Sequence, residues 1–519
     1  MDFLGKLLKF YNLSMDDYKE LIEEVKQEDL LSLADFEHGQ ISLECLKKHV
    51  ENNSKILIYG DYDCDGMMAT SILRIAFKYL NYENVGYYIP NRYKDGYGLN
   101  VENTNLFIEK GYKLIICVDN GISQFEAIKL ARENGLDVIV CDHHEVKEEL
   151  PDTPYIIHPA FSSCSTYCSG GYTSFVLASG LIERFDNYLF CLAAISIISD
   201  LMVLQNENRK IVKYALEILK KQRFIQIDLL GENNRINENV ISSLIAPKIN
   251  SIGRLVDNYN VNLVVKYFNS DDMNEIIKLY NYIDGVNKER KLLASNLKMN
   301  DISGSENSAV IEFLDVKEGL IGLFANKFLD MFNKPSFVFS KTNQNGVLKG
   351  SVRSKPGINV LDLFAQVSDL LLASGGHECA GGFSINESDL DTFKARIYKY
   401  CEDKTFEETM GDYIDIHLNE ITLENLQILE NLSPFGNGFK TPDFKISNYP
   451  SKSFDFSIDG KHIITKLSIN SSIICFNYNE ELLNKRYVDF YGNFRANYFK
   501  KRKNVNFVIK KMIAKDYYI

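Results

Sequence analysis

Three short apolar runs in the first third of the chain are each followed by a turn and then by a helical pattern. The runs cover residues 55–59, 113–118 and 137–141, and they are apolar at successive rather than alternate positions. Continuous apolar runs of this length indicate strands that are buried on both faces. Helical patterns between them, such as residues 67–80, indicate crossover helices. The pattern therefore predicts an α/β domain built on a parallel sheet.

The rest of the chain has other textures. Residues 1–50 show the periodicity of amphipathic helices, and the charged stretch 271–299 is typical of one long connecting helix. A Gly-rich region of mixed pattern follows, to about residue 400. The last ~80 residues alternate polar and apolar positions, which favours a small β-barrel.

Composition fits a multidomain globular protein. The chain has 519 residues, which predicts about three domains at roughly 150 residues each. Its apolar and charged fractions, 45% and 25%, exclude the disordered and collagen-like classes. The longest apolar run, residues 189–199, is about half the ~20 residues that a membrane span needs. We find no secretory signal and no CxxC pair among the ten cysteines, so we expect a reduced, cytoplasmic protein with no membrane partner.

Acidic residues and histidines follow each predicted strand directly. In chain order these residues are Asp61, Asp63, Asp65, Asp119, Asp142, His143 and His144. The carboxyl ends of parallel strands share one edge of the sheet, where ligands bind. So many acids would repel one another without cations, and carboxylates with imidazoles suit two Mg²⁺ or Mn²⁺ ions. Such a pair clamps the attacking and leaving oxygens of a phosphoryl displacement and makes hydroxide available near neutral pH.

Each of these motifs alone has a simpler interpretation. An Asp-x-Asp pair after a strand is often a solvated turn, and a His-His pair is more often structural than a ligand. Their occurrence at three successive strand ends favours a shared cation site. Asp200 closes the apolar run 189–199 and is a plausible further ligand.

Four segments resemble, in order, the motifs of the DHH phosphoesterase family: residues 61–66, 119–123, 142–144 and 199–200. Further segments resemble the branch of that family that degrades single-stranded DNA, with its DHHA1 and OB-fold domains: residues 90–99, 247–254, 350–354, 375–382 and 433–438. The resemblance implies an α/β fold in four parts, namely a parallel-sheet DHH domain with a helical N-terminal extension at 1–255, a connecting helix at 256–300, a smaller α/β DHHA1 domain at 301–405 and a C-terminal OB-fold β-barrel at 406–519.

The resemblance also implies roles for individual residues. Two ions, Mn²⁺ or Mg²⁺, would be held by Asp61, Asp63, Asp65, Asp119, His143 and Asp200. Asp119 would bridge the ions, Asp142 would orient a neighbour or ligate, and His144 would contact the scissile phosphate. Substrate would be bound by Arg92, Asn250, Arg254, Ser351, Arg353, Ser354, Gly376 and His377. Of these, Arg92 with Ser351 and Arg353 would hold a terminal 5′-phosphate.

The net charge of −12 hides an uneven distribution. Residues 440–519 carry 15 lysines and arginines against 7 acidic residues, a net charge of +8, so the preceding 439 residues carry −20. Basic residues alternate with aromatics here, as at Arg495, Tyr498, Phe499 and Phe507. Aromatic platforms in a basic groove are typical of non-specific single-strand binders. The alternative is a solvated hairpin whose aromatics belong to the core.

Together these features predict a metal-dependent 5′→3′ exonuclease that hydrolyses single-stranded DNA to 5′-mononucleotides in DNA repair and recombination. The direction of cleavage comes from the resemblance alone. The expected partners are single-stranded DNA, a single-strand-binding protein and a helicase. The alternative is a DHH phosphodiesterase for short oligoribonucleotides or cyclic dinucleotides, which would not need a basic C-terminal barrel. An inactive DNA-binding scaffold is a second alternative, but no acid of the motifs is missing.

Overall fold

The computed structural model describes residues 1–255, 259–295, 307–342, 345–406, 413–478, 484–499 and 502–516. The chain forms two compact units. The larger unit contains Leu30–Met202 and the described part of Asn206–Glu407, and the smaller contains Met1–Asp29, Val203–Gln205 and the described part of Glu408–Ile519.

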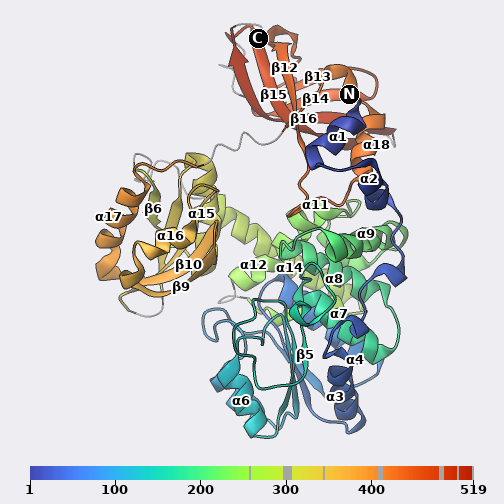
Figure 1. Ribbon diagram of the computed structural model, residues 1–519, viewed down its shortest axis with the longest axis vertical. Helices are drawn as coiled ribbons and strands as arrows, with labels where there is room; N and C mark the ends of the chain where they lie inside the picture. Colours follow the sequence, from blue (N-terminus) through green and yellow to red (C-terminus); the bar gives the residue numbers. More distant parts are fainter. Residues whose placement is uncertain are drawn as a thin grey trace. The chain divides into compact units, whose positions relative to one another are not determined.

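The larger unit contains a five-stranded parallel sheet in the order β2-β1-β3-β4-β5. Figure 1 labels its edge strand β5 and the helices α3, α4 and α6 of the same domain. Its strands are β1 (Ile56–Tyr59), β2 (Val85–Tyr88), β3 (Leu114–Val118), β4 (Asp137–Cys141) and β5 (Ile156–Ile157). Every residue of β1 and β3 is buried, because helices cover both faces of the sheet. The parallel sheet predicted from the apolar runs is confirmed.

Two layers of helices cover this sheet. Helices α5 (Val101–Glu109) and α6 (Phe125–Glu133) contact each other and share a core with β1, β3 and β4. The other layer contains α3 (Gly39–Glu51), α4 (Cys64–Tyr79), α7 (Gly170–Ile182) and α8 (Asn187–Ser199). The apolar run of the sequence forms α8, which is buried over most of its length.

Further helices lead to the second domain of the larger unit. They are α9 (Asn206–Lys221), α10 (Ile225–Leu230), α11 (Glu238–Val240), α12 (Ala246–Arg254), α13 (Asn262–Asn269) and α14 (Met273–Ser295). Helix α14 is the predicted connecting helix, and residues 296–299 of that prediction lie outside the described residues. No helix of the described chain combines the length and the apolarity that crossing a membrane requires.

The second domain is a mixed five-stranded sheet in the order β6-β7-β8-β10-β9. Its strands are β6 (Val310–Phe313), β7 (Ser336–Lys341), β8 (Val347–Arg353), β9 (Leu371–His377) and β10 (Ala380–Asn386), and its helices are α15 (Glu318–Phe332), α16 (Val360–Ala365) and α17 (Leu390–Cys401). The Gly-rich segments lie on β8, β9 and β10. Gly350 leaves room for the Phe383 ring, since a Cβ there would lie 2.4 Å from it.

The smaller unit is a six-stranded sheet in the order β11-β12-β15-β16-β14-β13. Its strands are β11 (Tyr413–Asp415), β12 (Asp443–Pro450), β13 (His462–Lys466), β14 (Ser471–Phe476), β15 (Tyr487–Phe499) and β16 (Arg502–Lys515), and its helices are α1 (Phe3–Tyr11), α2 (Met15–Ile22) and α18 (Leu423–Asn431). Strands β15 and β16 form a long antiparallel ribbon.

The N-terminal helix α1 packs on the C-terminal sheet. Phe3 stacks on Phe444 and on Phe494, with 5.6 Å between ring centroids in each pair. Phe3 and Leu7 are buried in this core, and Lys6 pairs with Glu420 at 2.8 Å. The predicted boundaries assigned the N-terminal helices to the first domain, 1–255. In the structure the apolar face of α1 is buried against the C-terminal sheet instead.

Candidate metal centre and active site

The loop after β1 carries three acids in a tightly packed turn. Asp63 caps the N-terminus of α4 and accepts a hydrogen bond from Gly66 N at 3.1 Å. Gly253 of α12 lies against this loop, and a Cβ on it would lie 1.9 Å from Tyr62 O. Packing therefore fixes the backbone that presents Asp61, Asp63 and Asp65.

The strand ends and the end of α8 bring the predicted ligands into overlapping groups, of which two hold the six residues predicted to ligate metal. Oxygen atoms of Asp61, Asp63 and Asp119 lie within 4.8 Å of one another, and so do ligand atoms of the group that comprises Asp65, His143 and Asp200. His143 Nε2 joins the groups, because it lies 3.1 Å from Asp119 Oδ1. It also lies 3.5 Å from both Asp65 Oδ2 and Asp200 Oδ2.

Asp119 sits in an unusual backbone conformation directly after β3. Its φ of +61° lies in the left-handed region, which is costly for a residue other than glycine and is found at functional sites. Its amide donates to Cys141 O at 2.9 Å, which ties it to the end of β4. The side chain of Asn120 donates to Val118 O and Tyr59 O and links the ends of β3 and β1.

Asp65 is supported by the N-terminus of α7. Its two carboxylate oxygens accept hydrogen bonds from Gly170 N at 2.9 Å and from Gly171 N at 2.6 Å. Small residues are required here, since a Cβ on Gly170 would lie 2.7 Å from the Asp119 side chain. The helix N-terminus favours the ionised carboxylate.

The acids nevertheless hold their protons tightly. Burial and the charge of Asp63 raise the pKa of Asp65 to about 7, and burial with the charge of Asp65 raises the pKa of Asp200 to about 8. Burial also raises the pKa values of Asp61 and Asp119 well above the ordinary range. A divalent cation would reverse these shifts by stabilising the charged forms.

The donor set fits such cations. Carboxylate oxygens suit Mg²⁺ and Mn²⁺, and imidazole is accepted by Mn²⁺. Asp61 Oδ1 is buried and has no hydrogen-bond partner among the described residues. Burial and the neighbouring charge of His144 lower the pKa of His143 to about 3, which keeps its imidazole neutral, as metal ligation requires. These acidic and histidine residues can therefore form a divalent-metal site.

Asp142 and His144 form a second kind of pair. Asp142 is fully buried, and its Oδ1 lies 2.8 Å from His144 Nδ1 while its Oδ2 accepts from Ile122 N at 2.9 Å. Although burial opposes the charged imidazole, the hydrogen bond and charge of Asp142 raise the pKa of His144 to about 9. Ligand atoms of Asp142 and His144 also lie within 4.8 Å of those of Asp119 and His143, so both predicted roles of Asp142, orienting a neighbour and ligating metal, stay predictions. The pair leaves a protonated His144 suited to contact a phosphate oxygen.

Tyr97 is a neighbour that sequence reasoning missed. Its hydroxyl lies 3.0 Å from His144 Nδ1 and donates to Asp119 O at 3.1 Å. The sequence pointed to Tyr97 only through its place in the segment 90–99, because a tyrosine in a Gly-rich turn has no spacing or neighbour that indicates a role in a site.

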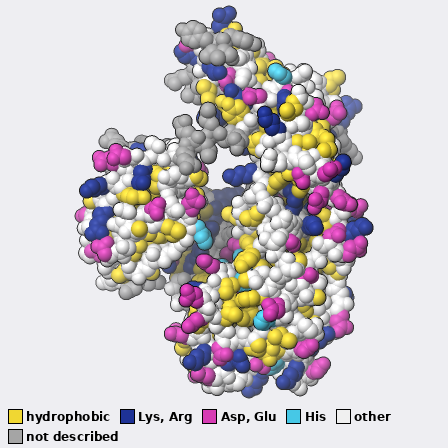
Figure 2. Space-filling model, viewed as in Figure 1, with side chains coloured by type: hydrophobic (Ala, Val, Ile, Leu, Met, Phe, Trp, Pro, Cys, Tyr) yellow, Lys and Arg dark blue, Asp and Glu magenta, His cyan; other side chains and the backbone are white. Residues whose placement is uncertain are grey.

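Four guanidinium groups converge beside the acids. Burial and then the charges of Arg92, Arg290 and Arg353 lower the pKa of Arg254 to about 10. Over the face seen in Figure 2, basic and acidic side chains are mixed on the larger unit. Crowded like charges of this kind suit a polyanion.

The positions of these arginines are fixed by specific contacts. The Arg92 guanidinium lies over the Tyr62 ring, 4.4 Å from its centroid. Arg353 Nη1 donates to Ser351 Oγ at 2.9 Å, and Arg254 Nη1 donates to Gly319 O at 3.2 Å. Arg290 of α14 was missed from the sequence, because one basic residue in a charged helix is usually interpreted as solvated surface.

The other predicted substrate residues have structural partners. Asn250 Oδ1 accepts from Cys64 N at 2.8 Å, so Asn250 supports the acidic loop. Ser354 is buried and donates to Ile358 O at 2.6 Å. Gly376 and His377 lie on the exposed strand β9, paired with β10. Their substrate roles stay predictions.

The aromatic residues that the sequence suggested as DNA-binding platforms on β15 and β16 are of two kinds, because one is buried in the core and another is exposed. Phe507 is fully buried in the barrel core, whereas Tyr498 is 55% exposed. Several lysines are already paired, since Lys503 contacts Glu430 and Lys510 contacts Asp443. Phe499 was also named as a platform, but its side chain lies outside the described residues.

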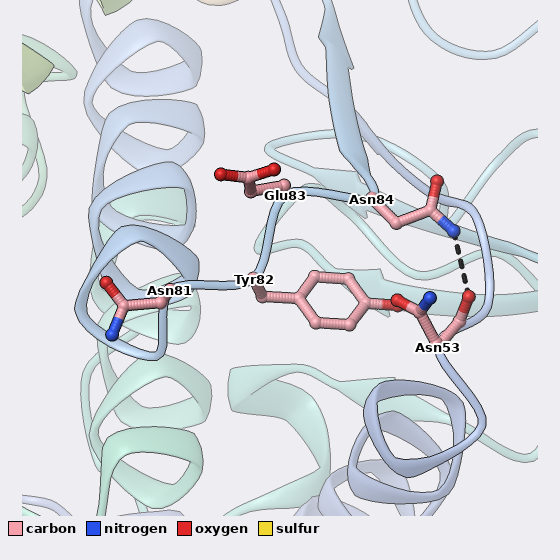
Figure 3. A pocket seen from close by; sticks show the side chains of 5 residues that line it. All are labelled: Asn53, Asn81, Tyr82, Glu83 and Asn84. Atoms are coloured by element: carbon pink, nitrogen blue, oxygen red, sulfur yellow. Dashed lines mark hydrogen bonds between the residues drawn. The ribbon is translucent and has the colours of Figure 1, made fainter.

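A polar hollow lies elsewhere on the first domain (Figure 3). It is lined by Asn53, Asn81, Tyr82, Glu83 and Asn84. Asn84 Nδ2 donates to Asn53 O at 2.8 Å. These residues precede β1 and β2, so the hollow lies at the end of the sheet opposite to the acids.

Three family models match the chain in succession. That of the DHH family, N-terminal domain, matches residues 55–219, that of the DHHA1 domain matches 306–403, and that of the RecJ OB domain matches 414–511. The chain therefore carries a DHH, a DHHA1 and a RecJ OB domain in that order. This order confirms the predicted fold class, while the exact domain boundaries stay a prediction.

Several similar proteins carry the name RecJ. The single-stranded-DNA-specific exonuclease RecJ of Bacillus subtilis (strain 168) is 33% identical over 410 residues, which are 75% of this chain and 52% of the relative. The chain therefore spans about half the length of that protein. RecJ from Thermus thermophilus, in complex with Mn²⁺, is similar in fold, with a TM-score of 0.80, 24% identity and coverage of 93% of this chain and 73% of the other. An exonuclease RecJ bound to manganese has a TM-score of 0.61 and 26% identity, over 72% of this chain and 96% of the other.

Proposed function

We propose that this DHH protein is a metal-dependent exonuclease that hydrolyses single-stranded DNA from its 5′ end and releases 5′-mononucleotides, in DNA repair and recombination. One observation carries the proposal: two cation-binding groups, joined by Asp119 and His143, lie next to a cluster of four arginines. A centre for two divalent ions beside an anion site is the arrangement that phosphodiester hydrolysis needs. The activity printed for the Bacillus subtilis relative supports single-stranded DNA as the substrate.

One ion would be held by Asp61, Asp63 and Asp119, and the other by Asp65, His143 and Asp200. When bound, such ions supply positive charge at the phosphate and lower the pKa of water. Asp119 would serve both ions.

The protein's own groups position the phosphate. His144, held by Asp142, keeps its proton at neutral pH and donates to a non-bridging oxygen of the scissile phosphate. Hydrogen bonds from fixed donors are stronger in a buried site and stabilise charge that develops in the transition state. Arg254 adds a further fixed positive charge.

Cleavage from one end requires a stop for the terminal nucleotide. Ser351 and Arg353, hydrogen-bonded to each other, would bind a terminal 5′-phosphate together with Arg92. A guanidinium group matches two phosphate oxygens at once. With the terminus held there, the first phosphodiester would reach the acids.

The setting of the enzyme is part of the proposal. All ten cysteines are free thiols, which fits the reducing cytoplasm. Single-stranded DNA there is coated by a single-strand-binding protein and produced by helicases, so these are the expected partners.

The test compares 5′-labelled and 3′-labelled single-stranded DNA in the presence of Mn²⁺. We expect labelled mononucleotide at once from the 5′ label and only late from the 3′ label. Early release from the 3′ end alone, or no mononucleotide, contradicts the proposal. Parallel reactions with short oligoribonucleotides and a cyclic dinucleotide test the alternative, which predicts faster turnover of those substrates than of long DNA.

A further inference from the structure

A second cluster of metal-binding side chains lies in the same domain, outside the acidic centre. Ligand atoms of Cys45, His49 and Asp137 lie within 4.8 Å of one another. His49 Nε2 is 3.0 Å from Asp137 Oδ2. We propose that these three residues form a binding site for a zinc-class transition-metal ion that joins α3 to the parallel sheet.

The fold places this cluster far from the proposed catalytic centre. Cys45 and His49 are four residues apart on α3, so they share one face of the helix. Asp137 begins β4, whereas Asp142 follows the other end of the same strand. The four residue steps from Asp137 to Cys141 span about 13 Å, so the two clusters occupy opposite ends of the sheet.

The surroundings of the cluster fit a bound ion. Cys45 is 7% exposed, and its thiol has the Tyr155 hydroxyl as a hydrogen-bonding neighbour. His49 Nδ1 is buried without a hydrogen-bond partner among the described residues, which is rare for a buried polar atom. The Asp137 side chain is 44% exposed, which gives an ion a path from solvent.

The ligand types select the metal. A thiolate, an imidazole and a carboxylate match the preferences of Zn²⁺, and Mg²⁺ avoids sulfur. Three protein ligands leave a fourth position for water. Since Cys45 and His49 come from α3 and Asp137 from β4, the ion would cross-link two elements and stabilise the fold.

Co²⁺ alone, titrated into the full-length protein, distinguishes this site from the acidic centre. A cobalt–thiolate bond gives a charge-transfer band in the near ultraviolet, and the two acidic groups contain no cysteine. We expect Co²⁺ in excess over all three sites to produce the band, at one cobalt–thiolate site per chain, in the parent protein and in Asp119→Asn. Cys45→Ser and His49→Ala should each abolish it. Cys64→Ser and Cys191→Ser, which replace buried thiols elsewhere, should retain it.

A thermal measurement covers the case in which a variant folds poorly. Zn²⁺ should raise the melting temperature of Asp119→Asn by several degrees and that of Asp119→Asn/Asp137→Asn by much less. The proposal is overturned if the parent protein shows no cobalt–thiolate band or if the band survives in Cys45→Ser. It is also overturned if Zn²⁺ raises the melting temperatures of Asp119→Asn and Asp119→Asn/Asp137→Asn equally. This result is independent of nuclease activity, so the two proposals can fail separately.

Discussion

His143 Nε2 lies 3.1 Å from Asp119 Oδ1, and this pair connects two groups of acids that come from four different segments of the chain. Asp119 follows β3 and His143 follows β4, two neighbouring strands of the parallel sheet. The close approach of their side chains is a direct consequence of strand order. In the proposed two-ion centre, Asp119 is the residue that both ions would share.

Replacement of Asp119 should therefore abolish catalysis while sparing DNA binding. Asp119→Ala would remove a ligand from both proposed ions, so we expect a loss of more than about 100-fold, the upper range for residues that only support a ligand. Affinity for single-stranded DNA should change less than about threefold, because the arginines remain. Nuclease rate and fluorescence anisotropy measure the two effects. Asp152→Asn, which replaces an exposed acid, is the control.

The Asp142–His144 pair should set the pH profile. Asp142→Asn removes the charge that raises the pKa of His144 to about 9, so the pKa should fall toward the ordinary value near 6.5. The variant should lose activity as the pH rises from about 6 to 8, a range over which the parent keeps a protonated His144. Equal pH dependence of the two proteins would show that His144 does not act as the cationic contact.

Metal binding should be linked to pH and stability. The pKa values of Asp65 and Asp200 are about 7 and about 8 in the folded protein, well above the ordinary carboxyl value. Between pH ~4 and ~8 the folded state therefore binds more protons than the unfolded state, and the unfolding free energy of the metal-free protein falls as the pH rises.

Mn²⁺ replaces those protons, so its stabilising effect should grow over the same pH range. Calorimetry at pH 6 and pH 8, with and without Mn²⁺, measures the increase in melting temperature. We expect the larger increase at pH 8. The double variant Asp65→Asn/Asp200→Asn should lose most of this difference.

Gly253 should be required for stability and activity, because only a residue without a side chain fits against the loop that carries the acids. In Gly253→Ala the new Cβ would lie 1.9 Å from Tyr62 O, so the loop that carries the acids must move. Overpacking of this kind costs about 1–3 kcal/mol of stability, and activity should fall with the displaced ligands. Gly285→Ala on α14 is a matched control, because its Cβ meets no atom within 4 Å. It should be neutral or stabilising by up to about 1 kcal/mol.

Arg290 should contribute to binding of the DNA backbone. Arg290→Ala should weaken binding of single strands of any sequence and reduce the salt dependence by roughly one counterion. Lys291→Ala, which replaces the adjacent exposed residue, is the control and should have little effect. If the two variants bind DNA equally well at several salt concentrations, Arg290 lies outside the DNA path.

The core of the site could be predicted because the sheet determines it. Once residues 55–59, 113–118 and 137–141 are identified as parallel strands, the acids that follow them must meet at one edge. The buried helix that ends at Asp200 was equally clear from its length and apolarity. The apolar runs of these strands and of this helix are visible in short stretches of sequence, and their burial in the structure agrees with them.

Other features depended on packing that no local pattern encodes. Arg290 joins the arginine cluster only because α14 passes beside α12. Phe507 of β16 lies in the core and Tyr498 of β15 at the surface, although period-two alternation alone does not say which face of each strand is buried. Helix α1 packs on a sheet about 440 residues later in the sequence, and only complementary apolar surfaces determine that contact.

Anomalous X-ray diffraction from crystals grown with Mn²⁺ counts and locates the bound ions. We expect two manganese peaks, one among Asp61, Asp63 and Asp119 and one among Asp65, His143 and Asp200, with Asp119 adjacent to both. A single peak, or manganese only at sites away from these residues, would show that these side chains do not hold a pair of ions.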